Sequence, residues 1–417
     1  MSEKEKDKFK WTFKARFRRG AFGWQSQPAM KRIEEAVSEI KKVASKNPTL
    51  AAEGAISFFE RLSPAIAHVD GSSGHMGSSV SWAIEQLVPI ISAAPVDHKT
   101  RHKWLERLWE ACQNDGIAYL DYLPEYWGDL CASKEIASKW ANDYIESVRL
   151  SLHPDYREYF KGTTPCLSAL LRAQRYEELL DLLKPDTLKF WNYQQFAIKA
   201  LVALGKIDEA IAHAEACRKT LNTSSLAVSC LCEEILLARG RIEEAYSHYA
   251  IEANQSNSNL STFRAIAKKY PQKERAKILN DLIESTPGQE GKWFATAKEL
   301  KLFGTAIQLA SITPCDPRTL TRAARDYIDV NPDFAMKAGQ CALHWLIEGH
   351  GYEITSGDVL EAYTYTLQAA EKLGLANTVQ SNLHNILLSK QKENNFVAKV
   401  LSPHLLVAQT PSAQLNV

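Results

Sequence analysis

The sequence predicts an all-α fold, arranged as a right-handed solenoid of helical hairpins. Apolar residues recur at helical spacing along most of the chain, and glycine and proline separate these periodic segments. Similar segments also return about every 30 to 35 residues in the C-terminal part. Because a single helical hairpin cannot bury its apolar face alone, neighbouring hairpins are expected to stack.

Composition and charge predict a globular protein with a locally basic N-terminus. Of the 417 residues, 45% are hydrophobic and 24% are charged, and the net charge is +1. Residues 1–32 hold ten Lys and Arg against three acidic residues, a net charge of +7, so the remainder carries −6. A local excess of this kind is expected of a docking surface rather than of a generally basic protein.

Cysteine usage and hydropathy predict a cytoplasmic protein without a membrane partner. The eight cysteines are scattered and form no CxxC pair, which is typical of reduced thiols packed as small apolar residues. No apolar run of the length that spans a bilayer is present, and the first residues lack the apolar core of a secretion signal.

Residues 1–27 are predicted to form a basic and aromatic arm. No acidic residue occurs between Lys8 and Arg32, and aromatic residues alternate with the cations. Cations release counterions from phosphates and rings stack on bases, so the arm predicts nucleic acid as partner, with DNA preferred to RNA. In the alternative interpretation, the rings cover the edge of a helical repeat and the cations remain in water. The residues predicted to contact nucleic acid are Lys14, Arg16, Arg18, Arg19, Phe22 and Trp24.

The alternation of Trp11, Phe13 and Phe17 within the arm is compatible with a short strand or an extended segment. Pro28 then marks the start of helical periodicity. Residues 28–158 predict antiparallel helix pairs in a HEAT-like stack, with Pro64 kinking or splitting the second helix.

A loop rich in glycine and serine, residues 70–79, precedes one of these predicted helices. Free N–H groups at a helix start attract phosphate, so the loop is a second candidate contact with nucleic acid. In the alternative interpretation, its serines cap the following helix. The candidate contacts in the loop are Gly71, Ser72, Ser73 and Gly74.

Residues 159–400 predict TPR-like repeats, and residues 401–417 predict a tail that is docked like a strand or disordered. Small or apolar residues recur at the predicted helix crossings of the repeats, and the groove of such a domain is a candidate site for a protein partner. The aligned positions are Leu179, Ala210, Ala245, Ala276 and Ala306.

The chain has no phosphate-binding glycine loop and no metalloprotease, serine-hydrolase or deaminase motif. We therefore expect no cofactor. No metal is expected either, because the spacing of the four histidines between residues 68 and 102 fixes no common register.

Carboxylates beside aromatic residues give the most specific chemical hypothesis. Asp70 opens the glycine–serine loop, Glu85 follows on the next helix, and Asp129 lies two residues after Trp127. A held carboxylate can stabilise an oxocarbenium-like sugar or activate water, and rings can pack the sugar or base, with Trp127 as a further contact. The pattern thus permits DNA glycosylase chemistry. In the alternative, Asp70 is a turn or capping residue and Asp129 a surface residue on a helix packed by tryptophan.

Several segments resemble a widespread family of bacterial all-helical repeat proteins: RFRR-AFGW, HVDGSSG, YWGDLCASKE, FKGTTPCLSALL and PCDPRTLTRAARD. This resemblance implies the fold and no activity. Residues 28–150 also resemble, in architecture alone, the HEAT-like alkylbase DNA glycosylases. The leading hypothesis is a DNA-binding protein with glycosylase activity in genome maintenance or defence against foreign DNA. A non-catalytic TPR-like scaffold for another protein is the alternative.

Overall fold

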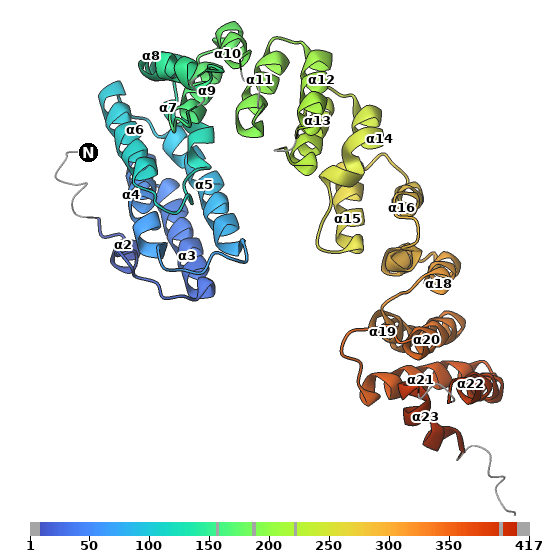
Figure 1. The fold of residues 1–417 in the computed structure, drawn as a ribbon. Coiled ribbons are helices and arrows are strands. Elements are labelled where there is room, and N and C mark those ends of the chain that lie inside the picture. Colours follow the sequence, from blue (N-terminus) through green and yellow to red (C-terminus); the bar gives the residue numbers. More distant parts are fainter. Residues whose placement is uncertain (1–8, 156–157, 186–188, 221–222, 392–394, 407–417) are drawn as a thin grey trace, which may run out of the picture. The chain divides into compact units, whose positions relative to one another are not determined.

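The computed structural model describes residues 9–155, 158–185, 189–220, 223–391 and 395–406. Within these ranges every regular element is a helix and no strand occurs, which confirms the all-α prediction (Figure 1). No helix in these ranges combines the length and the apolar character that crossing a bilayer requires.

The chain divides into two compact units, unit 1 (residues 1–235) and unit 2 (residues 236–417). The boundary predicted after residue 158 falls inside unit 1, where the helices on its two sides pack together. The elements of unit 1 are α2 (Thr12–Arg16), α3 (Ser26–Ala44), α4 (Pro48–Ile66), α5 (His75–Ala93), α6 (His98–Gln113), η1 (Leu123–Tyr126), α7 (Trp127–Cys131), α8 (Lys134–Ser151), α9 (Thr163–Arg172), α10 (Tyr176–Leu183), α11 (Trp191–Ala203) and α12 (Ile207–Arg218).

Helix α13 (Ser225–Ala238) spans the residues at which the two units meet in sequence. Its successor helices pack mainly against their neighbours in the chain. Residues 401–406 of the predicted tail belong to the last helix, and residues 407–417 lie outside the described residues. The elements of unit 2 are α14 (Ile242–Ala253), α15 (Asn259–Lys269), α16 (Arg275–Glu284), η2 (Glu290–Trp293), α17 (Phe294–Glu299), α18 (Phe303–Ile312), α19 (Pro317–Tyr327), α20 (Pro332–Ile347), α21 (Ser356–Lys372), α22 (Ala376–Gln391) and α23 (Phe396–Leu406).

The described part of the arm packs against α3 and α4 (Figure 1). Its short helix α2 replaces the expected strand or extended segment, because Phe13 and Phe17 are four residues apart and both reach Phe58 from one side of a helix. Their ring centroids lie 5.9 and 5.2 Å from that of Phe58. Trp11 covers Gly54, where a side chain would leave no room for the indole. These contacts match the alternative interpretation, in which the aromatic rings of the arm cover the edge of a helical repeat.

The periodicity of residues 28–44 correctly predicts a helix with one buried face. Ile33, Val37 and Ile40 are buried on α3. Asn47 caps α4 by accepting the N–H of Leu50 at 3.1 Å. Pro64 does not split α4, which continues to Ile66 because proline at the end of a helix removes few hydrogen bonds.

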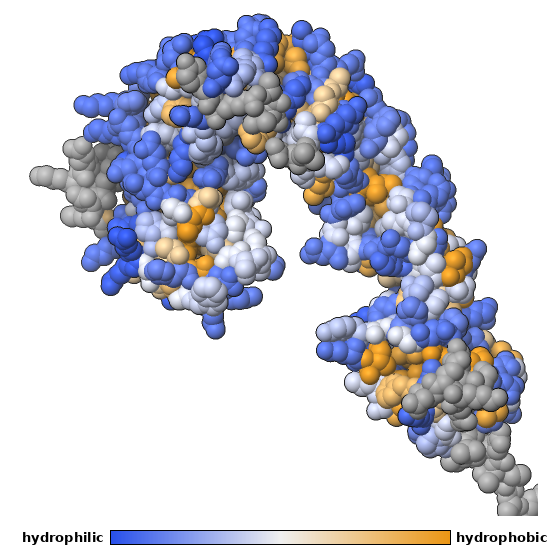
Figure 2. Space-filling model, in the orientation of Figure 1, coloured by the Kyte–Doolittle hydropathy of each residue, from blue (hydrophilic) through white to orange (hydrophobic). Residues whose placement is uncertain are grey.

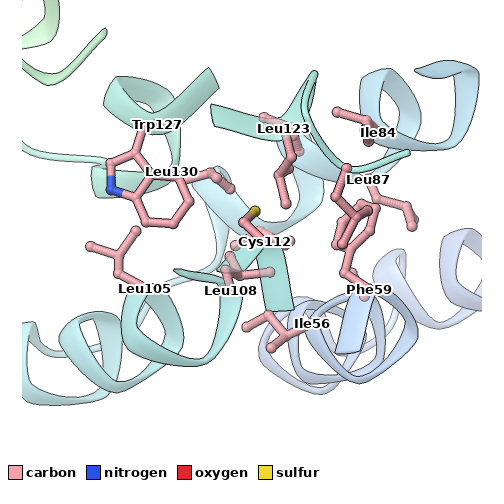
Figure 3. Packing of buried hydrophobic residues seen from close by; sticks show 14 of the residues in the cluster. Ile56, Phe59, Ile84, Leu87, Leu105, Leu108, Cys112, Leu123, Trp127 and Leu130 are labelled. Atoms are coloured by element: carbon pink, nitrogen blue, oxygen red, sulfur yellow. The ribbon is translucent and has the colours of Figure 1, made fainter. Parts of the chain in front are cut away.

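Tryptophans hold the centre of unit 1 together. The Trp127 ring lies 5.7 Å from that of Trp109 and 4.9 Å from that of Trp140, joining α6, α7 and α8. Figure 3 shows Trp127 in the same cluster as Leu105 and Leu130, all of them buried. Burying rings of this size contributes several kcal/mol each, on the order of 3–5 if one is truncated to alanine. Trp127 is therefore a core residue.

One type of turn recurs between helices of both units. A residue with positive φ ends one helix, and the next N–H bonds back to a carbonyl five residues earlier, as from Lys206 to Leu201 at 2.9 Å. A new helix starts directly afterwards, so each turn joins two consecutive helices. The positive-φ residues of these turns include Gln174, Gly205, Gly240, Lys301 and Gly374.

The aligned small residues are buried at most of the predicted helix crossings: Leu179, Ala210, Ala245 and Ala306 have no exposed surface. Ala276 is exposed, which corrects the alignment at that position. The reason is that α16 begins only at Arg275, and its buried face starts at Ile278. The recurring turn supports a repeat in residues 159–400, and the TPR-like solenoid remains a prediction.

Candidate functional site

The arm and the glycine–serine loop, which are distant in sequence, are adjacent in unit 1. The Gly20 N–H donates to the Pro64 carbonyl at 2.9 Å, and the Asp70 N–H donates to the Trp24 carbonyl at the same distance. Gly20 has a φ of +63°, and a side chain there would touch the His68 ring. The two predicted contacts with nucleic acid are thereby joined. We name the surface formed by Arg18, Arg19, Trp24 and residues 71–74 the arm–loop surface.

The cations of the arm differ in their surroundings. Arg16 pairs with Glu35, with 2.6 Å between Nη1 and Oε2. Lys14, Arg18 and Arg19 are exposed, and their side chains have no carboxylate partner among the described residues. These three cations are the ones that a phosphate could approach without displacing a carboxylate.

The rings of the predicted interface also differ. Trp24 is 72% exposed, the largest exposed indole surface at the arm. Phe22 is 5% exposed and lies under the Arg32 guanidinium, whose carbon is 5.0 Å from the ring centroid. Trp127 is completely buried. Because a base can stack only on an open ring face, we exclude Phe22 and Trp127 from the interface and retain Trp24.

The glycine–serine loop ends at Gly74, the N-cap of α5, which has a φ of +73° and caps the helix without a side chain. The interpretation that the serines cap α5 is therefore wrong. Ser72 and Ser73 are exposed, so the start of α5 is open to solvent. A helix start without a side-chain cap leaves N–H groups for an anion.

Asp70 shapes this loop. Its carboxylate accepts the N–H of Ser72 at 2.9 Å, and these hydrogen bonds from Ser72 lower the pKa of Asp70. The Tyr119 hydroxyl packs against Gly71, where a side chain would collide with it. Burial raises the pKa of Tyr119, and the charge of Asp70 adds to this shift. The geometry matches a turn-forming role for Asp70, as in the alternative interpretation.

A cleft of about 430 Å³ lies between η1, α7, α9 and α11 of unit 1. Ser168 fixes its floor, because its hydroxyl donates to the Glu125 carbonyl at 2.8 Å and accepts the Gly128 N–H at 2.9 Å. Gly128 permits this approach, since a side chain there would collide with the backbone of α9. We name it the Glu125 cleft, and the polar residues that line it include Tyr122, Glu125, Tyr126, Asp129, Arg172, Tyr176, Gln195 and Lys199.

Glu125 is the most perturbed carboxyl group of the cleft. Burial raises its pKa, and a hydrogen bond from Gln195 and the charge of Lys199 oppose this shift. The hydroxyls of Tyr122 and Tyr126 lie 3.1 Å apart. Burial and this hydrogen bond raise the pKa of Tyr126, so its hydroxyl stays protonated at neutral pH.

The three predicted catalytic carboxylates do not gather at one point. Asp70 holds the turn next to the arm–loop surface, and Asp129 lines the Glu125 cleft. Glu85 is exposed on α5 and contributes to the raised pKa of Tyr126, so it lies beside the cleft. With a rise of 1.5 Å per residue, Glu85 lies about 15 Å along α5 from His75, at the loop end of that helix.

Sequence reasoning missed Glu125 and Gln195. Glu125 precedes the YWGD segment and could have been singled out as a second carboxylate near Asp129. Its burial, however, depends on α9 and α11, which follow it by 38 residues or more. Gln195 carries no signal in the sequence.

Within the described ranges, no group of three or more His, Cys, Asp or Glu side chains is arranged to hold a metal ion. His68 lies beside Gly20, whereas His102 pairs with Glu106 at 3.4 Å. Burial raises the pKa of the Cys112 thiol to about 12, so it carries little thiolate at neutral pH.

In comparisons with known proteins, no family model and no curated protein sequence matches this chain. The resemblances drawn from the sequence therefore remain predictions.

Proposed function

We propose that this protein binds DNA through the arm–loop surface. The observation that supports the proposal most is the pair of backbone hydrogen bonds that joins the arm to the Asp70 turn. They bring two cations without carboxylate partners, Arg18 and Arg19, together with an exposed ring and an uncapped helix start. Each of these groups suits a different part of a nucleotide chain.

Phosphates are the chemical target of this surface. Arg18 and Arg19 can each donate two parallel hydrogen bonds to phosphate oxygens, and the N–H groups at the start of α5 can donate to a further oxygen. Trp24 can stack on a base that leaves the helix or on a single-stranded end. Much of the face of unit 1 shown in Figure 2 is hydrophilic, as expected for a surface that meets a charged partner.

Fluorescence anisotropy with labelled duplex and single-stranded DNA tests the proposal. Replacing Arg18 and Arg19 by alanine is expected to weaken DNA binding about tenfold at low salt, since two phosphate contacts are lost. Lys99 and Lys103 are exposed on α6 and provide a matched control, whose double alanine variant should bind as the wild type does. Equal loss in both variants would contradict a local interface, and stronger binding to RNA would change the partner.

Excision of a modified or damaged base is a second candidate function, favoured by the position of Asp129 in the cleft. Water would add to the sugar carbon C1′ while the bond from C1′ to the base nitrogen breaks, and the base would leave with a proton. A carboxylate at Asp129 would activate the water. Because Asp70 forms a turn, the role first assigned to it passes to Asp129.

Alkali-labile abasic sites in treated DNA report this reaction. Asp129→Asn is expected to lower their formation about a hundredfold, and Asp70→Asn to change it little. If the wild type forms no abasic sites in any modified DNA, base excision is ruled out for these substrates and DNA binding is unaffected.

A TPR-like scaffold for a protein partner is the remaining alternative. It is supported by the recurring turns and by the burial of Ala210 and Ala245 at consecutive helix crossings. DNA binding and its sensitivity to salt distinguish the two proposals, because a protein-binding scaffold has no reason to show either.

A further inference from the structure

We propose that the Glu125 cleft binds one nucleotide, with its base against the tyrosine rings and its phosphate on Arg172 and Lys199. The nucleotide could be free or could belong to a DNA strand. For a free nucleotide the inference stands without the arm–loop surface, and for a nucleotide within DNA it rests on the proposed function.

The walls of the cleft suit a flat ring. Tyr122 and Tyr126 meet edge to face, with centroids 5.3 Å apart and planes at 90°, so their ring faces point in different directions. Tyr176, from the start of α10, lines the same cleft and is half-buried. A volume of about 430 Å³ is within the size range of small-ligand sites. Phenol rings stack on any base, because every base has a π face.

The polar groups at the floor of the cleft suit the edge of a base. Gln195 is 9% exposed and lines the cleft together with Glu125. The Ser168 hydroxyl donates a hydrogen bond to the Glu125 carbonyl. The backbone that carries the Glu125 side chain is therefore held in place. The carboxyl oxygens of Glu125 can accept hydrogen bonds, and the Gln195 amide can both donate and accept. Adjacent donors and acceptors in one plane are the pattern that bases present on their pairing edge.

The charges of the cleft suit one phosphate group. Arg172 is held by its hydrogen bond to the Ala132 carbonyl at 2.9 Å, and the Lys199 amine donates to Gln195 at 3.2 Å. Asp129 opposes these cations, and Glu125 does so only when ionised. The two cations of the cleft therefore provide contacts for a single phosphate group.

Titration calorimetry on the full chain tests the free nucleotide. The probes are AMP, CMP, GMP and dTMP, their nucleosides and inorganic phosphate. At least one monophosphate is expected to bind about tenfold more tightly than its nucleoside, because the cations add a charged contact. Lys199→Glu should remove this advantage and leave the nucleoside affinity nearly unchanged. Lys206→Glu is the matched control, because Lys206 is exposed on the same unit, outside the cleft lining, and should have no effect.

A duplex with 2-aminopurine tests the nucleotide within DNA, because its fluorescence rises when the base leaves the stack. The wild type should raise it, and Lys199→Glu should not, although this variant still binds the duplex. Arg18→Ala with Arg19→Ala should weaken duplex binding about tenfold but keep any monophosphate binding, which separates the two proposals. Thermal unfolding checks that each variant is folded. The proposal is overturned if no monophosphate binds and the fluorescence stays unchanged, or if Lys199→Glu alters neither signal.

Discussion

The arm–loop surface and the Glu125 cleft both combine cations with aromatic rings, but the cations have different surroundings. Arg18 and Arg19 stand in solvent without carboxylate partners, beside a tryptophan that is 72% exposed. In the cleft, Arg172 and Lys199 lie beside two carboxyl groups, Asp129 and Glu125, and Glu125 is half-buried. Both sites belong to unit 1.

The difference shows that burial and pairing, and not residue type, decide what a basic site can bind. Open cations attract a long polyanion at any point along its backbone and are weakened by salt. Where cations and carboxylates balance in a cleft, binding depends on shape and hydrogen bonds. Such a cleft favours a small ligand over a long polyanion. The two sites should therefore respond differently to substitution and to pH.

The largest effect is expected from Phe17→Ala, which removes the ring beneath the arm–loop surface. Phe17 is 1% exposed and packs on Phe58, so the free energy of unfolding should fall by about 3–5 kcal/mol. Phe9→Ala is the control, since Phe9 is 42% exposed and its loss should cost less than about 0.5 kcal/mol. Urea unfolding followed by tryptophan fluorescence measures both, and equal costs would mean that the arm does not pack as described.

Ala210→Trp should act on the cleft and not on the arm–loop surface. Ala210 is buried on α12, which packs against α11, the helix that carries Gln195 and Lys199. Overpacking there should cost about 3 kcal/mol and weaken nucleotide binding while leaving DNA binding to the arm in place. Ala276→Trp is the matched control on an exposed position. If both substitutions destabilise the protein equally, the helix crossing at Ala210 is misassigned.

Trp24→Ala should act on the arm–loop surface alone. Loss of one stacking ring is expected to cost about 1–3 kcal/mol of binding to single-stranded DNA, with little change in stability. Trp82→Ala is the control, because Trp82 is 38% exposed on α5 and lies outside both sites. If the Trp24 variant binds single-stranded DNA as tightly as the wild type, Trp24 does not stack on a base and the arm–loop surface contacts phosphates only.

The smallest effects concern pH, and the two sites should respond in opposite directions. The pKa of Glu125 is raised by burial, so its contribution to stability is full below the unfolded pKa and is lost as pH rises through the folded value. Hydrogen bonds lower the pKa of Asp70, so its contribution is present above the unfolded pKa and is lost as pH falls through the folded value. Carboxyl NMR titrations of the wild type, Glu125→Gln and Asp70→Asn measure both shifts. Shifts of the same sign would contradict the contrast.

Sequence patterns were sufficient for long, regular elements and for local signals. The stripe of Ile33, Val37 and Ile40 predicts α3 because helical spacing persists over several turns. The arm, in contrast, is too short for the spacing of its aromatic residues to distinguish a strand from a helix. Trp11, Phe13 and Phe17 fit a period of two as well as one of nearly four, and only packing on α4 selects the helix.

The sites depended on contacts that no local pattern contains. Phe22 and Trp127 looked like stacking residues beside charges, and tertiary packing buried both. The adjacency of the arm and the loop arises from hydrogen bonds between Gly20 and Pro64 and between Trp24 and Asp70, across 44 and 46 residues. The raised pKa of Glu125 likewise depends on burial by helices that are distant in the sequence.

The dependence of DNA affinity on salt tests the central claim most directly. If Arg18 and Arg19 each neutralise one phosphate, replacing both by alanine should reduce the slope of log K against log salt by about 1.8 for a duplex. The Lys99→Ala, Lys103→Ala control should keep the slope of the wild type. A wild type that shows no salt dependence, or a double arginine variant with an unchanged slope, would contradict binding of DNA through the arm–loop surface.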